Sequence, residues 1–199
     1  MPKKVDFLQS KTRTNLARAF SGECQDGARY QFMAKQAEEQ GYPYIKTILK
    51  TIAKNEMAHA ERFFNLIGQS TDTKQENIDI TAGYPFVCGD LNCTLKDSID
   101  TELSQSKNIY PQFAKIAKDE GFPEIAEAFT CASIVEEKHA KQLTEILTKL
   151  KSNNLYKSST STKWTCSNCG YYKTAKTAWS KCPSCLSPQG FVMINLEEK

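Results

Sequence analysis

The chain has 199 residues, of which 40% are hydrophobic, so it is long enough to bury a core and to carry a small second domain. Its net charge is only +3 and no run of Lys and Arg stands out, which argues against nucleic-acid binding. No apolar stretch approaches the length of a membrane span, and the first ten residues lack the apolar segment of a secretory signal. We therefore expect a cytoplasmic protein that contacts no membrane.

Four amphipathic helices are predicted, because apolar residues recur at every third or fourth position in four segments. These segments are residues 12–40, 45–68, 95–116 and 125–150. Gly41-Tyr42-Pro43 ends the first and Gly121-Phe122-Pro123 ends the third, as Gly and Pro commonly do. Residues 69–93 lack periodicity and are predicted to form a long connection. Two short turns and one long connection are typical of a ferritin-like four-helix bundle with a single crossover.

Six ionisable residues lie on the apolar faces of these helices. The first and third helices carry one Glu each, and the second and fourth carry one Glu-x-x-His motif each. The six residues are Glu23, Glu56, His59, Glu102, Glu136 and His139. A carboxylate in a core is costly unless it is paired or binds a metal, and residues three apart on a helix face the same way. No Lys or Arg occupies the neighbouring core positions, so we predict a two-metal site rather than a metal-free ion-pair network.

The last part of the chain is predicted to form a separate small domain. Residues 152–163 are rich in Ser, Thr, Asn and Lys, which indicates a flexible linker. It would join a bundle over residues 1–151 to a small domain of strands and loops over residues 164–199.

Four of the eight cysteines are grouped in this small domain as two Cys-x-x-Cys motifs, twelve residues apart. They are Cys166, Cys169, Cys182 and Cys185. This spacing is a strong indication of a tetrahedral four-sulfur metal site, in which iron and zinc are both plausible. The metal is expected to hold the domain together, since so short a segment has little core. The remaining cysteines are expected to be small, buried, apolar-like residues, and these are Cys24, Cys88, Cys93 and Cys131.

Several stretches of the sequence resemble the rubrerythrin family, and together they span nearly the whole chain. They are Ala19-Phe20-Ser21-Gly22-Glu23, Asn55-Glu56-Met57-Ala58-His59, Ile109-Tyr110-Pro111-Gln112-Phe113-Ala114 and Glu136-Glu137-Lys138-His139. The stretch Lys163-Trp164-Thr165-Cys166-Ser167-Asn168-Cys169-Gly170-Tyr171 resembles a rubredoxin knuckle. The order of a di-iron bundle followed by a rubredoxin-like domain is the usual one in that family.

The resemblance implies a peroxidase that reduces hydrogen peroxide to water in defence against oxidative stress. It implies two iron ions in the bundle, which zinc or manganese could replace, and one iron in the four-cysteine site, which zinc could replace. Tyr30 and Tyr110 match the tyrosines that hydrogen-bond the ligand carboxylates, with ordinary aromatic packing as the alternative. Electrons would reach a homodimer from a rubredoxin or a separate NAD(P)H-dependent reductase, because the chain has no dinucleotide-binding fingerprint.

The sequence departs from the family pattern at three positions. Family members usually have a second Glu one turn after the first on the third helix, where this chain has Gln105. In the duplicated hairpin the counterpart of Gln105 is Asp26, and we hypothesise that Asp26 supplies the missing carboxylate; the alternative is an acid outside the ligand set. His59 and His139 are then expected to behave more alike than in other members. Leu186 stands where rubredoxins generally have Gly.

Two other functions stay open on the sequence. One is a ferroxidase that oxidises iron with oxygen, and the other is an iron-storage or metal-buffer protein whose four-cysteine domain is a structural zinc ribbon. Colour separates these, because a ferric four-sulfur site is red and bleaches on reduction, whereas a zinc site is colourless.

Overall fold

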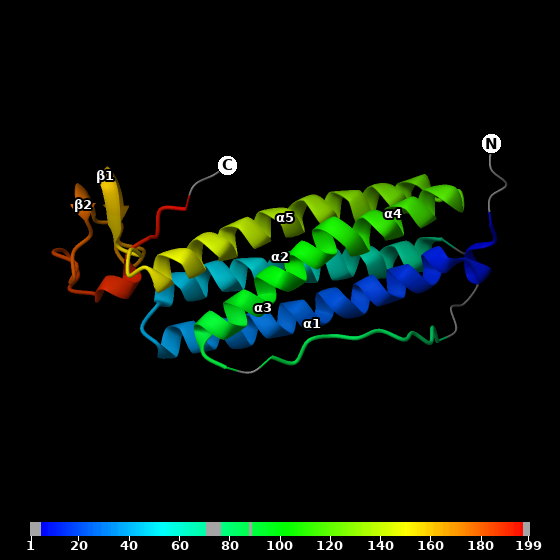
Figure 1. Cartoon of the computed structure of the whole chain (residues 1–199), viewed down its shortest axis with the longest axis horizontal. Helices are drawn as coiled ribbons and strands as arrows, with labels where there is room; N and C mark the ends of the chain where they lie inside the picture. Colours follow the sequence, from blue (N-terminus) through cyan, green and yellow to red (C-terminus); the bar gives the residue numbers. More distant parts are fainter. Residues whose placement is uncertain (1–4, 71–76, 88, 197–199) are drawn as a thin grey trace.

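The computed structural model describes residues 5–70, 77–87 and 89–196 of the chain. The predicted four-helix bundle with one crossover is confirmed (Figure 1). Its helices are α1 (Lys11–Glu39), α2 (Pro43–Gln69), α3 (Leu91–Ser104), α4 (Tyr110–Asp119) and α5 (Pro123–Lys151). A π-helical turn, η2 (Gln105–Ile109), joins α3 to α4, and a short 3-10 helix, η1 (Phe7–Gln9), precedes α1. Among the described residues, no helix combines the length and the apolarity that a membrane span requires.

The two helical hairpins repeat the same turn. Gly41 and Gly121 adopt the left-handed conformation, with φ of 84° and 88°, which ends the preceding helix. The residue after each glycine donates its N–H to a carbonyl five residues back, from Tyr42 to Ala37 and from Phe122 to Ala117, both at 2.8 Å. A proline then begins the next helix, where its missing N–H costs nothing.

The crossover runs along the outside of the bundle beside α1 (Figure 1). Two hydrogen bonds hold its described part, residues 77–87, to that helix. Tyr84 Oη donates to the Arg18 carbonyl at 3.2 Å, and Arg18 Nε donates to the Thr81 carbonyl at 3.1 Å. The crossover carries the chain from one end of the bundle to the other, so α3 starts near the end where α1 finishes.

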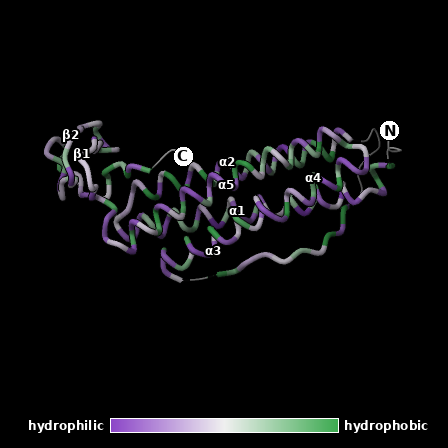
Figure 2. The backbone as a smooth tube through the Cα atoms, turned by 45° about the horizontal axis from the view of Figure 1, so that its top comes forward, coloured by the Kyte–Doolittle hydropathy of each residue, from purple (hydrophilic) through white to green (hydrophobic). Residues whose placement is uncertain are grey.

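The bundle has two apolar clusters with a polar layer between them. One cluster gathers around Tyr30, Ile52 and Leu143, and the other around Phe63 and Phe129. Hydrophobic residues recur along every helix in alternation with hydrophilic ones, as an amphipathic bundle requires (Figure 2). The six predicted ligands fall, in each helix, between the residues of the two clusters.

The third helix is not uniform, although the sequence predicted one continuous helix. The N–H of Tyr110 donates to the carbonyl of Gln105, five residues back, which defines the π turn. The turn inserts one residue into the helix. As a result Glu102 and Tyr110, which are eight apart, face the same way as Glu23 and Tyr30, which are seven apart in α1.

The predicted linker over residues 152–163 is wrong in its second half. Residues 157–163 form most of strand β1 (Lys157–Thr165), which pairs antiparallel with β2 (Tyr172–Thr177). A ribbon of two strands has little buried face, so most of its residues are polar and its composition is that of a linker. Its Thr residues, however, favour a strand. We therefore place the boundary between the two domains near residue 156.

The small domain is docked on the end of the bundle (Figure 1). Leu155 and Ile194 are both 5% exposed and belong to the bundle's apolar cluster. Gly190, in the 3-10 turn η3 (Gln189–Phe191), lies so close to the turn before α2 that a Cβ there would collide with the Gly41 carbonyl oxygen. These contacts hold the small domain against the bundle, whereas the sequence indicated a domain joined only by a flexible linker.

Candidate metal centre

The six predicted ligands converge from four helical segments on two overlapping groups, each with one ligand atom per residue within 4.8 Å of the others. The first group is Glu23, Glu56, His59 and Glu136, and the second is Glu56, Glu102, Glu136 and His139. Glu56 and Glu136 belong to both groups, so they lie between two metal positions. Glu23 and Glu102 each serve one position. The arrangement has the pseudo-twofold symmetry of the duplicated hairpin.

Each histidine directs Nδ1 at three carboxylates. His59 Nδ1 lies 3.1 Å from Glu136, 3.4 Å from Glu56 and 3.6 Å from Glu23. His139 Nδ1 lies 3.0 Å from Glu56, 3.1 Å from Glu136 and 3.7 Å from Glu102. In both cases Nδ1 is therefore the atom that would face a metal.

These contacts shift the pKa values of the site. Burial lowers the pKa of His59 and His139, but the carboxylates that surround each ring outweigh burial and raise both pKa values to about 12. Burial raises the pKa of Glu102 to about 8 and that of Glu23 well above its ordinary value. Burial also raises the pKa of Glu136, but the same protonated histidines outweigh burial and lower that pKa, and a metal that binds Nδ1 has to displace their protons.

The residues fit a pair of metal ions. Eleven buried side-chain polar atoms among the described residues lack a directed hydrogen bond, and six of them belong to this cluster. These six are Glu23 Oε2, Glu56 Oε1 and Oε2, His59 Nδ1, Glu102 Oε2 and Glu136 Oε1. Buried polar atoms are nearly always satisfied, and carboxylate and imidazole are ligands that iron accepts. Metal coordination accounts for all six atoms at once.

Two buried tyrosines connect the hairpins across the site. Tyr30 donates its hydroxyl to Glu102, and Tyr110 donates its hydroxyl to Glu23. Each tyrosine thus orients the carboxylate of the other hairpin, which the π turn makes possible by aligning Tyr110 with Glu102. Burial raises the pKa of both phenols well above the ordinary value, so both keep their protons.

The two histidines are supported differently. The amide of Asn55 lies 3.2 Å from His139 Nε2. The residue at the equivalent place in the second motif is Val135, which has no polar group to offer His59. The His59 side chain is 18% exposed and that of His139 is 3% exposed. The expectation that the two histidines behave alike is therefore not favoured, because Asn55 supports the His139 ring at Nε2 and Val135 offers the His59 ring no such contact.

Asp26 and Gln105 meet each other rather than the metal ligands. Gln105 Nε2 donates to Asp26 Oδ2 at 2.8 Å, and Asp26 also pairs with Arg29, which reaches Asp97 at 3.0 Å. Asp26 is in neither carboxylate group found among the described residues. Its carboxylate is already engaged, so the contacts favour a role in positioning Gln105 over direct ligation.

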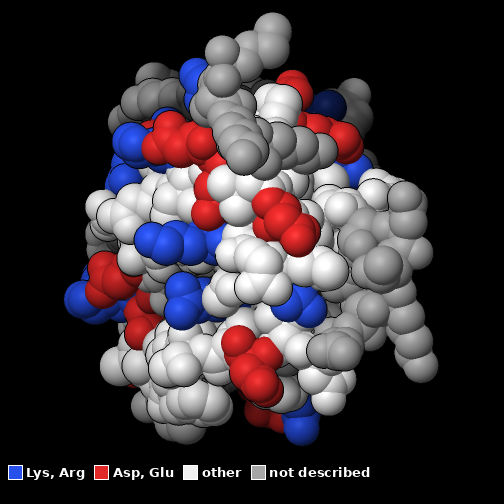
Figure 3. Space-filling model, turned by 90° about the vertical axis from the view of Figure 1, so that its right-hand side faces the viewer, with Lys and Arg blue, Asp and Glu red and all other residues white. Residues whose placement is uncertain are grey.

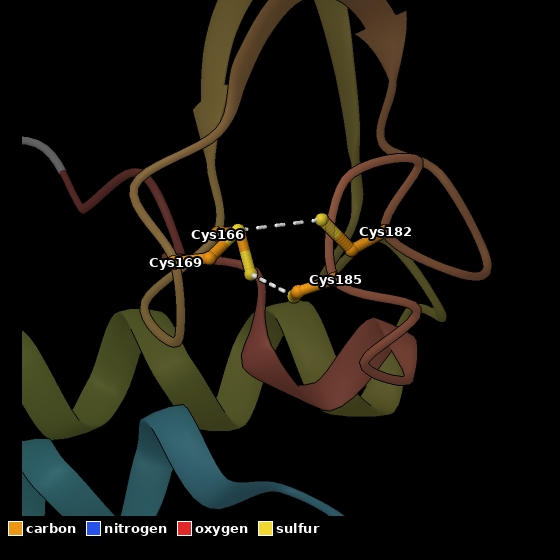
Figure 4. Close-up of side chains that lie close together, drawn as sticks. All are labelled: Cys166, Cys169, Cys182 and Cys185. Atoms are coloured by element: carbon orange, nitrogen blue, oxygen red, sulfur yellow. Dashed lines mark hydrogen bonds between the residues drawn. The ribbon is translucent and has the colours of Figure 1, made fainter.

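The four grouped cysteines also come together, with their side chains pointing toward one another from two loops (Figure 4). The sulfurs of Cys166 and Cys185 are 3.7 Å apart, and those of Cys169 and Cys182 are 3.8 Å apart. Hydrogen bonding to Ser187 lowers the pKa of Cys185 to about 5, which favours the thiolate that a metal needs. The four ligand atoms fit one tetrahedral ion.

The other cysteines follow the prediction only in part. Cys24 is half-buried, whereas Cys93 and Cys131 are exposed, so these two are not core residues. Cys88 lies outside the described residues.

Sequence reasoning missed two features of the site. The π turn had a signal, because the Glu–Tyr spacing is seven residues in one hairpin and eight in the other. Asn55 had only a weak signal in the sequence. It is a polar residue directly before Glu56, whereas the second motif has Val135 directly before Glu136.

Comparison with known proteins agrees with this geometry. The model of the rubrerythrin family matches residues 14–147 and 93–170. The chain is 37% identical to Rubrerythrin-1 of Clostridium acetobutylicum over 185 residues, which covers 93% of this chain and 94% of that protein. It is 32% identical to the rubrerythrin of Nitratidesulfovibrio vulgaris over 181 residues, which covers 90% and 92%. The structure of partially reduced nigerythrin has the same fold, with a TM-score of 0.61, 24% identity and coverage of 97% and 94%.

Proposed function

Since this chain belongs to the rubrerythrin family, we propose that it is a di-iron peroxidase that reduces hydrogen peroxide to water. The observation that carries the proposal is the joint presence of two metal sites. One is a buried cluster of four carboxylates and two histidines for a pair of irons, and the other is a four-sulfur site for a single iron. Cleaving an O–O bond takes two electrons, and a one-electron site in the same chain suits the replenishment of such a pair.

The irons, when bound, supply the two electrons of the reaction, and the chain's own residues do the rest. Glu56 and Glu136 would hold both metal positions, and the Tyr30 and Tyr110 hydroxyls orient Glu102 and Glu23, the carboxylates that would each serve one position. The substrate reaches the histidine side, where cavities of ≈ 300 Å³ and ≈ 580 Å³ between α2 and α5 are both lined by His59. The proton that each water product needs is available from solvent at this partly exposed edge.

The electron supply is proposed to be intermolecular. His59 lies sixteen residues along α2 from Pro43, the residue beside the docked domain, which is about 24 Å of helix. That separation is too long for efficient transfer within one chain. A homodimer that brings one subunit's four-cysteine domain to its partner's bundle would shorten it, and a rubredoxin or an NAD(P)H-dependent reductase would supply the electrons. The cysteines that the structure describes are free thiols, in keeping with the cytoplasm.

The test is metal content combined with anaerobic reoxidation. Purified protein should contain two irons in the bundle and one in the four-cysteine site, and should be red until it is reduced. The three ferrous irons hold three electrons and each peroxide accepts two, so peroxide at more than one and a half equivalents should restore the colour, much faster than oxygen does. Faster reoxidation by oxygen with ferrous iron as substrate would indicate a ferroxidase, and a colourless four-cysteine site that holds zinc would indicate metal storage.

A matched pair of variants assigns the reaction to the bundle. Glu136→Ala removes a carboxylate shared by both metal positions and should abolish peroxide-dependent reoxidation. Glu137→Ala removes the neighbouring carboxylate, which pairs with Lys107 and Lys141 on the surface, and should leave the rate unchanged.

A further inference from the structure

The four-cysteine domain has an unusual charge. Residues 157–196 contain five lysines, no arginine and no Asp or Glu. All five lysines are exposed, and they are Lys157, Lys163, Lys173, Lys176 and Lys181. The opposite end of the molecule differs, because Lys and Arg lie there beside Asp and Glu (Figure 3). With Glu197, Glu198 and Lys199 included, residues 157–199 hold six lysines and two glutamates, a net charge of +4 against +3 for the whole chain.

Three of these lysines are near ligand cysteines in the sequence or in the sheet register. Lys181 directly precedes Cys182, and Lys173 pairs in the sheet with Trp164, two residues before Cys166. Lys163 pairs with Thr174 and so lies on the other face of the ribbon from Lys173, with Nζ 4.3 Å from the centre of the Tyr172 ring; the two lysines thus flank the ribbon on both faces. Fixed cations around one site raise the encounter rate with an anionic partner, and no Asp or Glu between residues 157 and 196 opposes them; the acids of this domain, Glu197 and Glu198, follow that stretch.

Leu186 gives the site an apolar contact point that folding does not explain. It follows Cys185 directly, its side chain is 62% exposed, and its φ is 62°. A leucine in the left-handed conformation is strained, and an exposed side chain gains no stabilisation from burial that would offset the strain. Glycine would satisfy this turn better. A strained and exposed apolar residue next to a ligand cysteine is better explained by contact with a partner.

We propose that Leu186 and the lysines at positions 163, 173 and 181 form a docking surface for an acidic one-electron carrier protein. The proposal rests on the proposed function, because it concerns how the four-sulfur iron is reduced. The reduced carrier gives up one electron, the ferric four-sulfur iron becomes ferrous, and no bond or proton changes hands. Cys169 and Cys185 are the less buried ligands and lie on the side that a carrier can approach.

An acidic protein suits this surface better than a nucleic acid. Lysine is a point charge suited to steering, whereas arginine, which pairs with phosphate through two hydrogen bonds, is absent from the domain. A small apolar contact with a charged rim is typical of the transient complexes through which electron carriers act.

The experiment measures the rate at which a reduced acidic rubredoxin reduces the iron-loaded protein. The triple variant K163Q/K173Q/K181Q should slow the second-order rate roughly tenfold at low salt and abolish most of its salt dependence. The control K11Q/K54Q/K118Q removes the same charge from exposed bundle lysines and should change the rate less than roughly twofold. Rubredoxin with amidated carboxylates should react slowly with wild type and show no further loss with the triple variant.

Leu186→Gly separates docking from structure. A role in the fold alone predicts that removing the strain raises the melting temperature and leaves the rate unchanged. Docking predicts the same or a higher melting temperature with a rate roughly threefold lower. Binding of oxidised rubredoxin can be measured without electron transfer by chemical-shift titration of the zinc-loaded proteins. The affinities of wild type, the two triple variants and Leu186→Gly should fall in the same order as their reduction rates.

Three results would overturn the proposal. These are equal effects of the two triple variants, an unchanged rate for Leu186→Gly, and loss of self-association in K163Q/K173Q/K181Q without loss of carrier-dependent reduction. The last would assign the surface to a second copy of the chain. Peroxide reoxidation of dithionite-reduced protein, measured in parallel, tests the peroxidase function separately, and its failure alone would leave the docking surface intact.

Discussion

Replacement of Asn55 by Ala is expected to weaken one of the two metal positions selectively. Asn55 Nδ2 lies 3.2 Å from His139 Nε2. With Nδ1 bound to a metal, Nε2 carries a proton, and a turn of the Asn55 amide presents its oxygen to accept that proton. The side chain of His139 is 3% exposed, so water cannot easily replace this partner.

The magnitude follows from the loss of one buried hydrogen bond that orients a ligand. Such losses typically reduce metal affinity by about 10- to 100-fold, or about 1.4–2.7 kcal/mol. Because His139 belongs to one of the two ligand groups, one step of a two-step titration should weaken and the other should stay unchanged. Alanine favours helices more than asparagine, so α2 should remain folded.

Cobalt titration of metal-free protein, followed by visible absorption, measures both steps. Val135→Ala is the matched control, since Val135 occupies the equivalent place beside the other motif and offers His59 no hydrogen bond. The reasoning is refuted if Asn55→Ala weakens both steps equally, or if the two variants behave alike. Val135→Asn offers a converse test, because it should tighten the step that involves His59.

Three further outcomes are expected. Gly190→Ala should detach the four-cysteine domain from the bundle, because its Cβ would collide with the Gly41 carbonyl; limited proteolysis near residue 156 should then become fast, and unchanged proteolysis would contradict the docking. Asp26→Ala should leave the iron content unchanged but lower the free energy of unfolding by about 3 kcal/mol, since it breaks a buried ion pair; loss of iron would restore the ligand hypothesis. Metal loading at pH 7 should release the protons of His59 and His139, whose pKa values rise from 6.5 to about 12, so calorimetric enthalpies should vary with the buffer. Before loading, those protonated pairs stabilise the fold fully below pH 6.5, and that stabilisation is lost as the pH rises through about 12.

The bundle and its six ligands were predictable because helical periodicity places residues on faces regardless of long-range contacts. A carboxylate at a core position, such as Glu23 or Glu102, then stands out as an anomaly with a chemical meaning. The π turn was not predictable from periodicity, because one inserted residue shifts the face only downstream, at Tyr110. The β1 strand was also missed, because the residues of an exposed ribbon have the composition of a linker.

The role of Asp26 shows a different limit. Internal symmetry correctly pairs position 26 with position 105, and the two side chains do meet. Symmetry gives no information on Arg29, which lies one turn after Asp26 on α1 and pairs with the Asp26 carboxylate. Whether an acid binds metal or a neighbouring cation depends on contacts that only the folded chain shows.

Gln105 stands where family members usually have a Glu, and this replacement also affects the charge balance of the two-metal centre. Four carboxylates carry four negative charges, which two divalent ions neutralise, and Asp26 lies outside this set, paired with Arg29, which it shares with Asp97. A fifth carboxylate at position 105 would match ions of higher charge better. In a buried site this difference is only weakly screened, so the chain is expected to favour the divalent pair. The metal pair should then have a higher midpoint potential than in Gln105→Glu, and equal potentials in the two proteins would show that charge balance does not govern this centre.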